Sequence, residues 1–126
     1  MPDTLYDAIG GDAAVRRLVD RFYDHMDVLP DVATLRAMHP PALGESRDKL
    51  YWFLSGWLGG PSLYIERKGH PRLRARHLPF VVDRAARDAW MRCMDLALAE
   101  VVADEGLRTG LSDALGQVAT HMMNRE

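Results

Sequence analysis

Histidine is the residue type in this chain best suited to bind a metal, and His77 stands in a distinctive setting. It lies within a basic run at residues 72–80, just before Pro79, which limits how the segment can bend. A neutral imidazole is a common metal ligand. Taken alone, however, a histidine at the end of a short basic helix is more often a surface residue. A metal-binding role for His77 therefore needs support from the rest of the sequence.

Two aromatic residues with polar atoms, Tyr23 and Trp90, fall on the inward faces of predicted helices. Aromatic residues at helical spacing usually pack in a core. A buried tyrosine O–H and a buried tryptophan N–H still need hydrogen-bond acceptors, and the indole N–H can only donate. At this point Tyr23 and Trp90 are either core residues or donors to a bound ligand.

The sulfur-containing residues favour packing over chemistry. Cys93 is the single cysteine, which excludes an intramolecular disulfide and argues against a cysteine-based zinc site. It lies on the inner stripe of a predicted helix, so we expect a shielded thiol whose pKa is not lowered. Met94, Met122 and Met123 are expected to fill the core or the chain end rather than bind a metal.

Composition describes an ordinary globular domain. The chain has 126 residues, of which 48% are hydrophobic, which fits a single domain over residues 1–126 with one core. The formal net charge of −2 gives no overall attraction to nucleic acid or to an anionic membrane. No N-terminal stretch resembles a signal peptide and no run is long enough to span a bilayer, so a cytoplasmic location is expected.

Helical periodicity dominates the first third of the chain. Thr4 and Asp7 form a capping box before a short helix that Gly10-Gly11 ends, and Asp12 is expected to cap the next helix. Pro30 prevents that second helix from continuing. The residues that define its buried face are Val15, Leu18, Val19, Phe22, Tyr23 and Met26.

The remaining segments are also helical or irregular. We expect a turn at 35–38, a helix over 43–57, a long connection at 59–72, a short helix at 73–78, a helix capped by Asp83 and a last helix over 107–123. The inner face after Asp83 holds Ala86, Trp90, Cys93, Met94, Ala97 and Val101. No period-two pattern appears, so the sequence predicts an all-α fold of about five or six helices.

Four separated elements of this sequence agree with one known family. The run Gly-His-Pro-Arg-Leu-Arg-Ala-Arg-His-Leu-Pro-Phe at 69–80 resembles the haem-ligand segment of truncated haemoglobins. Trp90 follows His77 by 13 residues, and the Phe22-Tyr23 pair and the Gly59-Gly60-Pro61 stop also match. Together they resemble group II of that family, which carries a tryptophan on the distal side, from Leu5 to about Met123.

The resemblance implies a globin-like, two-over-two helical sandwich around haem b, with His77 as the axial iron ligand. One neutral imidazole leaves the opposite iron position open for a diatomic ligand. The second ring nitrogen of His77 is expected to donate to a nearby backbone carbonyl. The positions that surround the ligand are matched by Tyr23, His39, Ser46, Leu50 and Trp90.

His39 departs from the family pattern, since relatives often carry tyrosine or phenylalanine there. An imidazole with a reference pKa of ~6.5 can donate or accept, so His39 is either a third distal donor or an exposed bystander. Ser46 replaces the distal histidine of ordinary globins, so hydrogen bonds to the ligand must come from elsewhere.

Further residues are expected to contact the haem. A basic cluster is formed by Lys68, Arg72, Arg74 and Arg76, and it is either a solvated helix face or a partner for the haem propionates. The cluster is too short, and has too few flanking aromatic residues, to indicate a nucleic-acid-binding surface. The expected haem contacts are Lys49, Leu50, Tyr64, His70, Arg76, His77, Phe80, Trp90 and Met94.

Three functions fit this interpretation. The leading hypothesis is a haem protein that binds O2, and also CO or NO, and releases it slowly, with oxygen transport as the matching role. The second is a peroxidase-like or NO-consuming enzyme that uses the same haem and an external reductase. The third is a cofactor-free helical interaction module. The chain is expected to be a monomer or a homodimer.

Overall fold

The computed structural model describes residues 3–125, and the side chain of Arg74 lies outside the described part. Every regular element in residues 3–125 is helical, which confirms the all-α prediction, but there are eight α-helices where five or six were expected. They are α1 (Leu5–Ile9), α2 (Asp12–Val28), α3 (Ala33–Ala37), α4 (Gly44–Trp57), α5 (Leu63–Lys68), α6 (Leu73–His77), α7 (Arg84–Val101) and α8 (Glu105–His121), with a 3-10 turn at Pro30–Val32 before α3.

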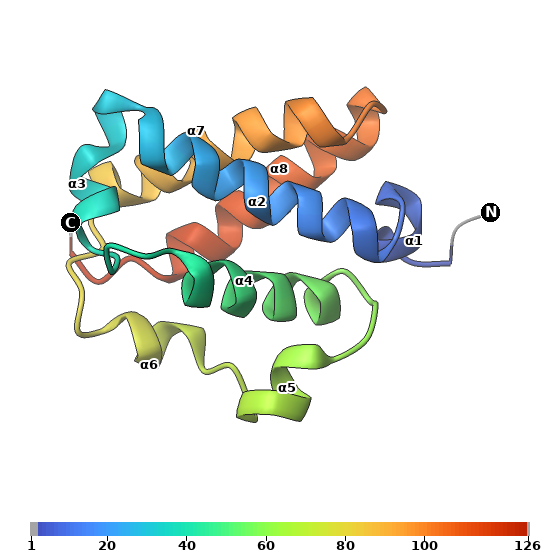
Figure 1. Ribbon diagram of the computed structural model, residues 1–126, viewed down its shortest axis with the longest axis horizontal. Coiled ribbons are helices and arrows are strands. Elements are labelled where there is room, and N and C mark those ends of the chain that lie inside the picture. Colours follow the sequence, from blue (N-terminus) through green and yellow to red (C-terminus); the bar gives the residue numbers. More distant parts are fainter. Residues whose placement is uncertain (1–2, 126) are drawn as a thin grey trace.

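Two antiparallel pairs of long helices form the body of the molecule (Figure 1). α2 packs against α4 and against α7, and α7 packs against α8, so α2 joins the two pairs. The short helices α5 and α6 lie beyond α4, on the side away from α2 (Figure 1). This is the predicted two-over-two arrangement. Within residues 3–125, no helix combines the length and the apolar composition that a membrane span requires.

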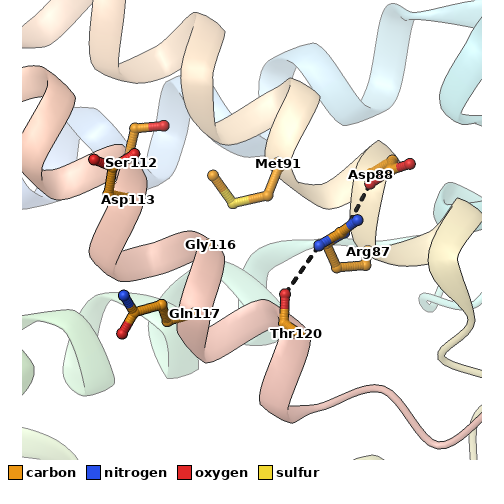
Figure 2. A pocket seen from close by; sticks show the side chains of 8 residues that line it. All are labelled: Arg87, Asp88, Met91, Ser112, Asp113, Gly116, Gln117 and Thr120. Carbon is orange, nitrogen blue, oxygen red and sulfur yellow. Dashed lines mark hydrogen bonds and ion pairs between the residues drawn. The ribbon is translucent and has the colours of Figure 1, made fainter.

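The outer side of the α7–α8 pair carries an open pocket of about 500 Å³ (Figure 2). Arg87 closes one end of it by donating to Asp88 over 2.7 Å and to the Thr120 hydroxyl over 2.9 Å. None of the site residues predicted from the sequence lines this pocket, which is bounded by Arg87, Asp88, Met91, Ser112, Asp113, Gly116, Gln117 and Thr120.

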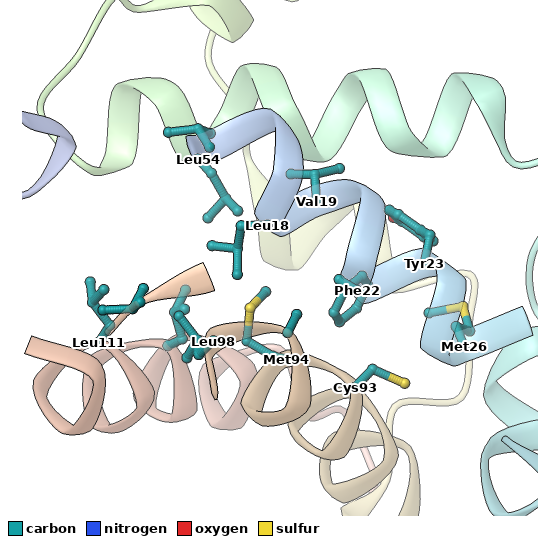
Figure 3. Packing of buried hydrophobic residues seen from close by; sticks show 14 of the residues in the cluster. Leu18, Val19, Phe22, Tyr23, Met26, Leu54, Cys93, Met94, Leu98 and Leu111 are labelled. Atoms are coloured by element: carbon teal, nitrogen blue, oxygen red, sulfur yellow. The ribbon is translucent and has the colours of Figure 1, made fainter. Parts of the chain in front are cut away.

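The core lies where α2 crosses α7. Figure 3 shows Leu18 and Phe22 of α2 directed toward Met94 and Cys93 of α7. Phe22, Cys93 and Met94 have no exposed surface. Burying each large apolar side chain stabilises the fold by about 1.5–3 kcal/mol. The predicted buried face of α2 is confirmed in full, since Val15, Leu18, Val19, Phe22, Tyr23 and Met26 are all buried.

The junction between α1 and α2 differs in one detail from the prediction. The Thr4 hydroxyl accepts the Asp7 N–H over 3.0 Å, which confirms that cap. The expectation that Asp12 caps α2 is wrong, because Gly11 occupies the cap position with φ 78° and α2 begins at Asp12. Two successive glycines end α1 and complete the turn, which leaves no cap position for Asp12. Its carboxylate instead accepts a hydrogen bond from the Tyr51 hydroxyl.

The connection predicted at 59–72 is not irregular throughout, because it contains α5. Tyr64 is the buried residue of this helix and fixes it to the molecule. At the start of the connection a Cβ on Gly60 would lie 2.4 Å from the Tyr6 ring, so only glycine fits there. The sequence does not predict α5, because a helix of six residues is too short to show a clear apolar periodicity.

Charged contacts fix α2 to both of its neighbours. Arg47 of α4 donates to Asp24 over 2.9 Å. On the opposite side Glu100 of α7 accepts from Arg21 over 2.8 Å, and its other oxygen lies 2.5 Å from His25 Nε2. The hydrogen bonds from Arg21 and His25 lower the pKa of Glu100 to about 2. Exposed pairs of this kind contribute little stability each, but together they set the register of three helices.

Candidate functional site

His77 is the last residue of α6, and its ring is half-buried. Its Nδ1 lies 2.6 Å from the carbonyl oxygen of Leu73, one helical turn earlier. A carbonyl only accepts, so in the neutral ring Nδ1 carries the proton and Nε2 keeps a lone pair. The expected hydrogen bond from the imidazole to the backbone is therefore confirmed. Nε2 is the ring atom available to a metal.

The segment that leads into His77 is shaped by local contacts. Arg72, at the start of α6, has φ 45°, a left-handed conformation that is unusual for a residue with a side chain. Its N–H donates to His70 Nδ1 over 3.1 Å. Arg76 donates from Nε to the Pro71 carbonyl over 2.7 Å and lies over the Tyr64 ring, 5.7 Å from its centroid. His70 and Arg76 thus help to set the path of the chain into His77.

An open pocket of about 760 Å³ lies beside this segment, within the size range of cofactor sites. Leu73, whose carbonyl orients His77, is part of its wall. Aromatic and aliphatic residues share the wall with basic ones, which fits an apolar cofactor that carries acidic groups. The lining residues are Phe53, Trp57, His70, Pro71, Arg72, Leu73, Ala75, Ala114, Gln117, Val118, His121 and Met122.

Tyr23 and Trp90 are brought together by the ring of Phe22. The Phe22 ring centroid lies 4.9 Å from that of Tyr23 and 5.0 Å from that of Trp90. The Tyr23 O–H and the Trp90 N–H donate to no other described residue, and no described side-chain nitrogen or oxygen is both buried and unpaired. Both donors therefore face accessible space. Burial raises the pKa of Tyr23, so its hydroxyl keeps its proton.

His39 lies beside Tyr23, with the two ring centroids 6.0 Å apart. Its Nδ1 is 2.9 Å from the Leu35 carbonyl oxygen, so in the neutral ring Nδ1 holds the proton. Burial, above all other causes, lowers the pKa of His39 below its ordinary value of 6.5. At neutral pH His39 thus presents a lone pair at Nε2 and not an N–H, which favours an acceptor over a third donor.

Arg36 is a supporting residue that the sequence analysis did not select. It donates to the carbonyls of Pro40 and Pro41 over 3.0 and 2.8 Å, and to Asp27 over 2.9 Å. These bonds hold the loop that follows His39 against the end of α2. No short sequence motif predicts these hydrogen bonds, since an arginine in a five-residue helix is normally solvated.

The other predicted residues occupy varied positions. Ser46 and Leu50 are half-buried on α4, and Tyr64 is buried on α5. Lys49 is exposed and pairs with Glu45 over 3.0 Å, and Phe80 is 44% exposed after α6. Met94 packs within the core and does not line the large pocket.

Cys93 has the environment that was expected of it. It is a free cysteine, fully buried among the core residues of α7. Burial raises the pKa of its thiol to about 11, so the thiolate is scarce at neutral pH.

Comparison with known proteins places these residues in a wider context. The Bacterial-like globin family model matches residues 4–124. The chain is 41% identical over 120 residues to the group 2 truncated hemoglobin YjbI of Bacillus subtilis, covering 95% of this chain and 88% of that protein.

Two solved structures are similar over nearly their full length. The cold-adapted truncated hemoglobin of Pseudoalteromonas haloplanktis TAC125 is 44% identical, with a TM-score of 0.96 over 98% of this chain and 100% of that one. The group II 2-on-2 hemoglobin of Agrobacterium tumefaciens is 46% identical, with a TM-score of 0.95 over 99% of this chain and 97% of that one.

Proposed function

The chain belongs to the bacterial-like globins and, within them, to the group II truncated haemoglobins, and on that premise we propose that it binds O2 at a haem b iron held by His77. Membership of the family implies haem and the binding of diatomic gases. The single observation that carries the assignment of His77 is its hydrogen bond to Leu73, which in the neutral ring places the proton on Nδ1 and the lone pair on Nε2. The donor set thus fits haem iron, which takes a neutral imidazole.

Haem, when bound, would supply an iron centre that binds a diatomic gas. The protein's own residues then do two things. His77, oriented by the Leu73 carbonyl, would hold the iron through Nε2, and the largely apolar wall of the 760 Å³ pocket beside it would contact the cofactor. Basic residues of that wall, such as Arg72, suit the propionates.

We assign the stabilisation of O2 to Tyr23 and Trp90. Each offers one donor that is unused by other described residues, and both pack on Phe22, which fixes their relative positions. These donors would stabilise bound O2 more than bound CO, because O2 would be the stronger hydrogen-bond acceptor of the two gases. Neutral His39 donates its one ring N–H to the Leu35 carbonyl, so it offers no further donor to a bound gas.

A titration with haemin tests this proposal. The purified chain is expected to take up one equivalent and to show a Soret band. Its ferrous form is expected to bind O2 reversibly, because His77 would be the single protein ligand of the iron. A chain that acquires no Soret band is the cofactor-free helical module, and the proposal is then wrong.

One observation favours a second candidate function, a peroxidase-like activity. A peroxidase needs a base near the reacting peroxide, and the neutral His39 has a free Nε2 beside Tyr23. If His39 acts in this way, His39→Phe should lower the rate of peroxide consumption by about 100-fold while the O2 dissociation rate stays within about twofold. Equal peroxide rates in both proteins would remove this candidate.

A further inference from the structure

We propose that Asn124 is a positioning residue for the imidazole of His77, an inference that rests on the proposed function. Asn124 follows α8, near the C-terminal end of the chain, where that end lies beside the loop between α6 and α7 (Figure 1). The loop directly continues the helix that ends at His77. A side chain that fixes the loop therefore also fixes the position of the metal-binding residue.

The contacts use every hydrogen-bonding group of the Asn124 side chain. Its Nδ2 donates to the Phe80 carbonyl over 2.9 Å and to the His77 carbonyl over 3.3 Å. Its Oδ1 accepts the Val82 N–H over 2.9 Å. The Asn124 backbone N–H donates to the Val82 carbonyl, also over 2.9 Å. The amide thus caps the carbonyl end of α6 and pairs with the loop after it.

These bonds join α6 to a distant part of the chain. Residues 73–82 make several hydrogen bonds to residues more than six positions away in the sequence. Among the described residues, the distant partner in each of these bonds is Asn124 or Arg125. The other bonds of this segment, including that from His77 to Leu73, are local and hold the helix only to itself. Asn124 is therefore the side chain that relates the position of His77 to α8.

Only an amide of this length satisfies both kinds of partner. The two carbonyls require a donor and the Val82 N–H requires an acceptor, and asparagine supplies both from one planar group. Aspartate has the same shape but only acceptors, so it would place a negative charge against two carbonyl oxygens. Alanine would remove the group and leave the carbonyls to water. The two substitutions thus separate the loss of the amide from an added repulsion.

The test compares haem release from the haem-loaded wild-type chain, Asn124→Ala, Asn124→Asp and Asn124→Gln, using transfer to an excess of a haem-free acceptor globin. We expect Asn124→Ala to release haem about 10-fold faster, the effect of one or two lost neutral hydrogen bonds, and Asn124→Asp faster still. Asn124→Gln, which keeps the amide, should recover part of the difference. The iron–histidine stretching band of the ferrous, gas-free protein should shift and broaden in the same order.

Thr120→Ala is the matched control. Thr120 lies near the end of α8 and accepts a hydrogen bond from Arg87 of α7, and its side chain makes no hydrogen bond to the α6–α7 loop. We expect this variant to keep the wild-type release rate and band. Haem-loaded Asn124 variants that behave like the wild type, or a control that changes as much as they do, would overturn this assignment alone. A wild-type chain that takes up no haem would overturn the proposed function first.

Discussion

Haem affinity is expected to fall by about 100-fold or more when His77 is replaced by alanine, because His77 is the one histidine of α6 and the Leu73 carbonyl orients its ring. The change removes the ligand and leaves the Leu73 carbonyl free to solvent. Added imidazole should enter the space of the lost ring and restore the ferrous spectrum in part. Haemin titration and the ferrous absorption spectrum, with and without imidazole, measure the effect.

His70→Ala provides the comparison for His77→Ala. His70 lies on the wall of the 760 Å³ pocket, but its Nδ1 accepts the Arg72 N–H, so we expect only a modest change in affinity. The assignment of the axial ligand is wrong if His77→Ala keeps a native five-coordinate ferrous spectrum without imidazole.

Trp90→Phe is expected to raise the O2 dissociation rate by about 10- to 100-fold, which corresponds to the loss of one hydrogen bond of about 1.5–3 kcal/mol to a partly charged acceptor. The association rate should change little, because free O2 is apolar and gains nothing from a donor before it binds. Phenylalanine keeps a ring against Phe22 and limits the cavity that the substitution leaves. Stopped-flow dissociation of O2 and of CO from both proteins measures the effect.

The comparison of the two gases separates a donor from a packing residue. CO is a weaker acceptor, so its dissociation rate should rise by a clearly smaller factor than that of O2. If Trp90 only packs, both rates should change by the same small factor, and the donor assignment fails. Trp52→Phe is the control, since that half-buried ring packs against Arg67 and makes no ring contact with Phe22 or Tyr23, so both rates should stay unchanged.

The sequence by itself determined the long helices and the kind of hydrogen bond that orients His77. Apolar spacing located α2 and its buried face, and Asp83 capped α7 as expected. His77 and His39 each bond to the carbonyl four residues earlier, at Leu73 and Leu35. Because such contacts lie within one helical turn, local sequence was sufficient to predict a backbone partner for His77, whereas the bond of His39 was not predicted.

The tertiary structure decided which of these residues act together and how they ionise. Packing of α2 against α7 brings Trp90 onto Phe22, although 68 positions separate them, and burial beside Tyr23 keeps His39 neutral. The role of Asn124 is likewise invisible in the sequence, since its partners His77 and Val82 precede it by 47 and 42 residues. Helical periodicity correlates residues three or four apart, whereas contacts over such distances depend on how complete helices pack.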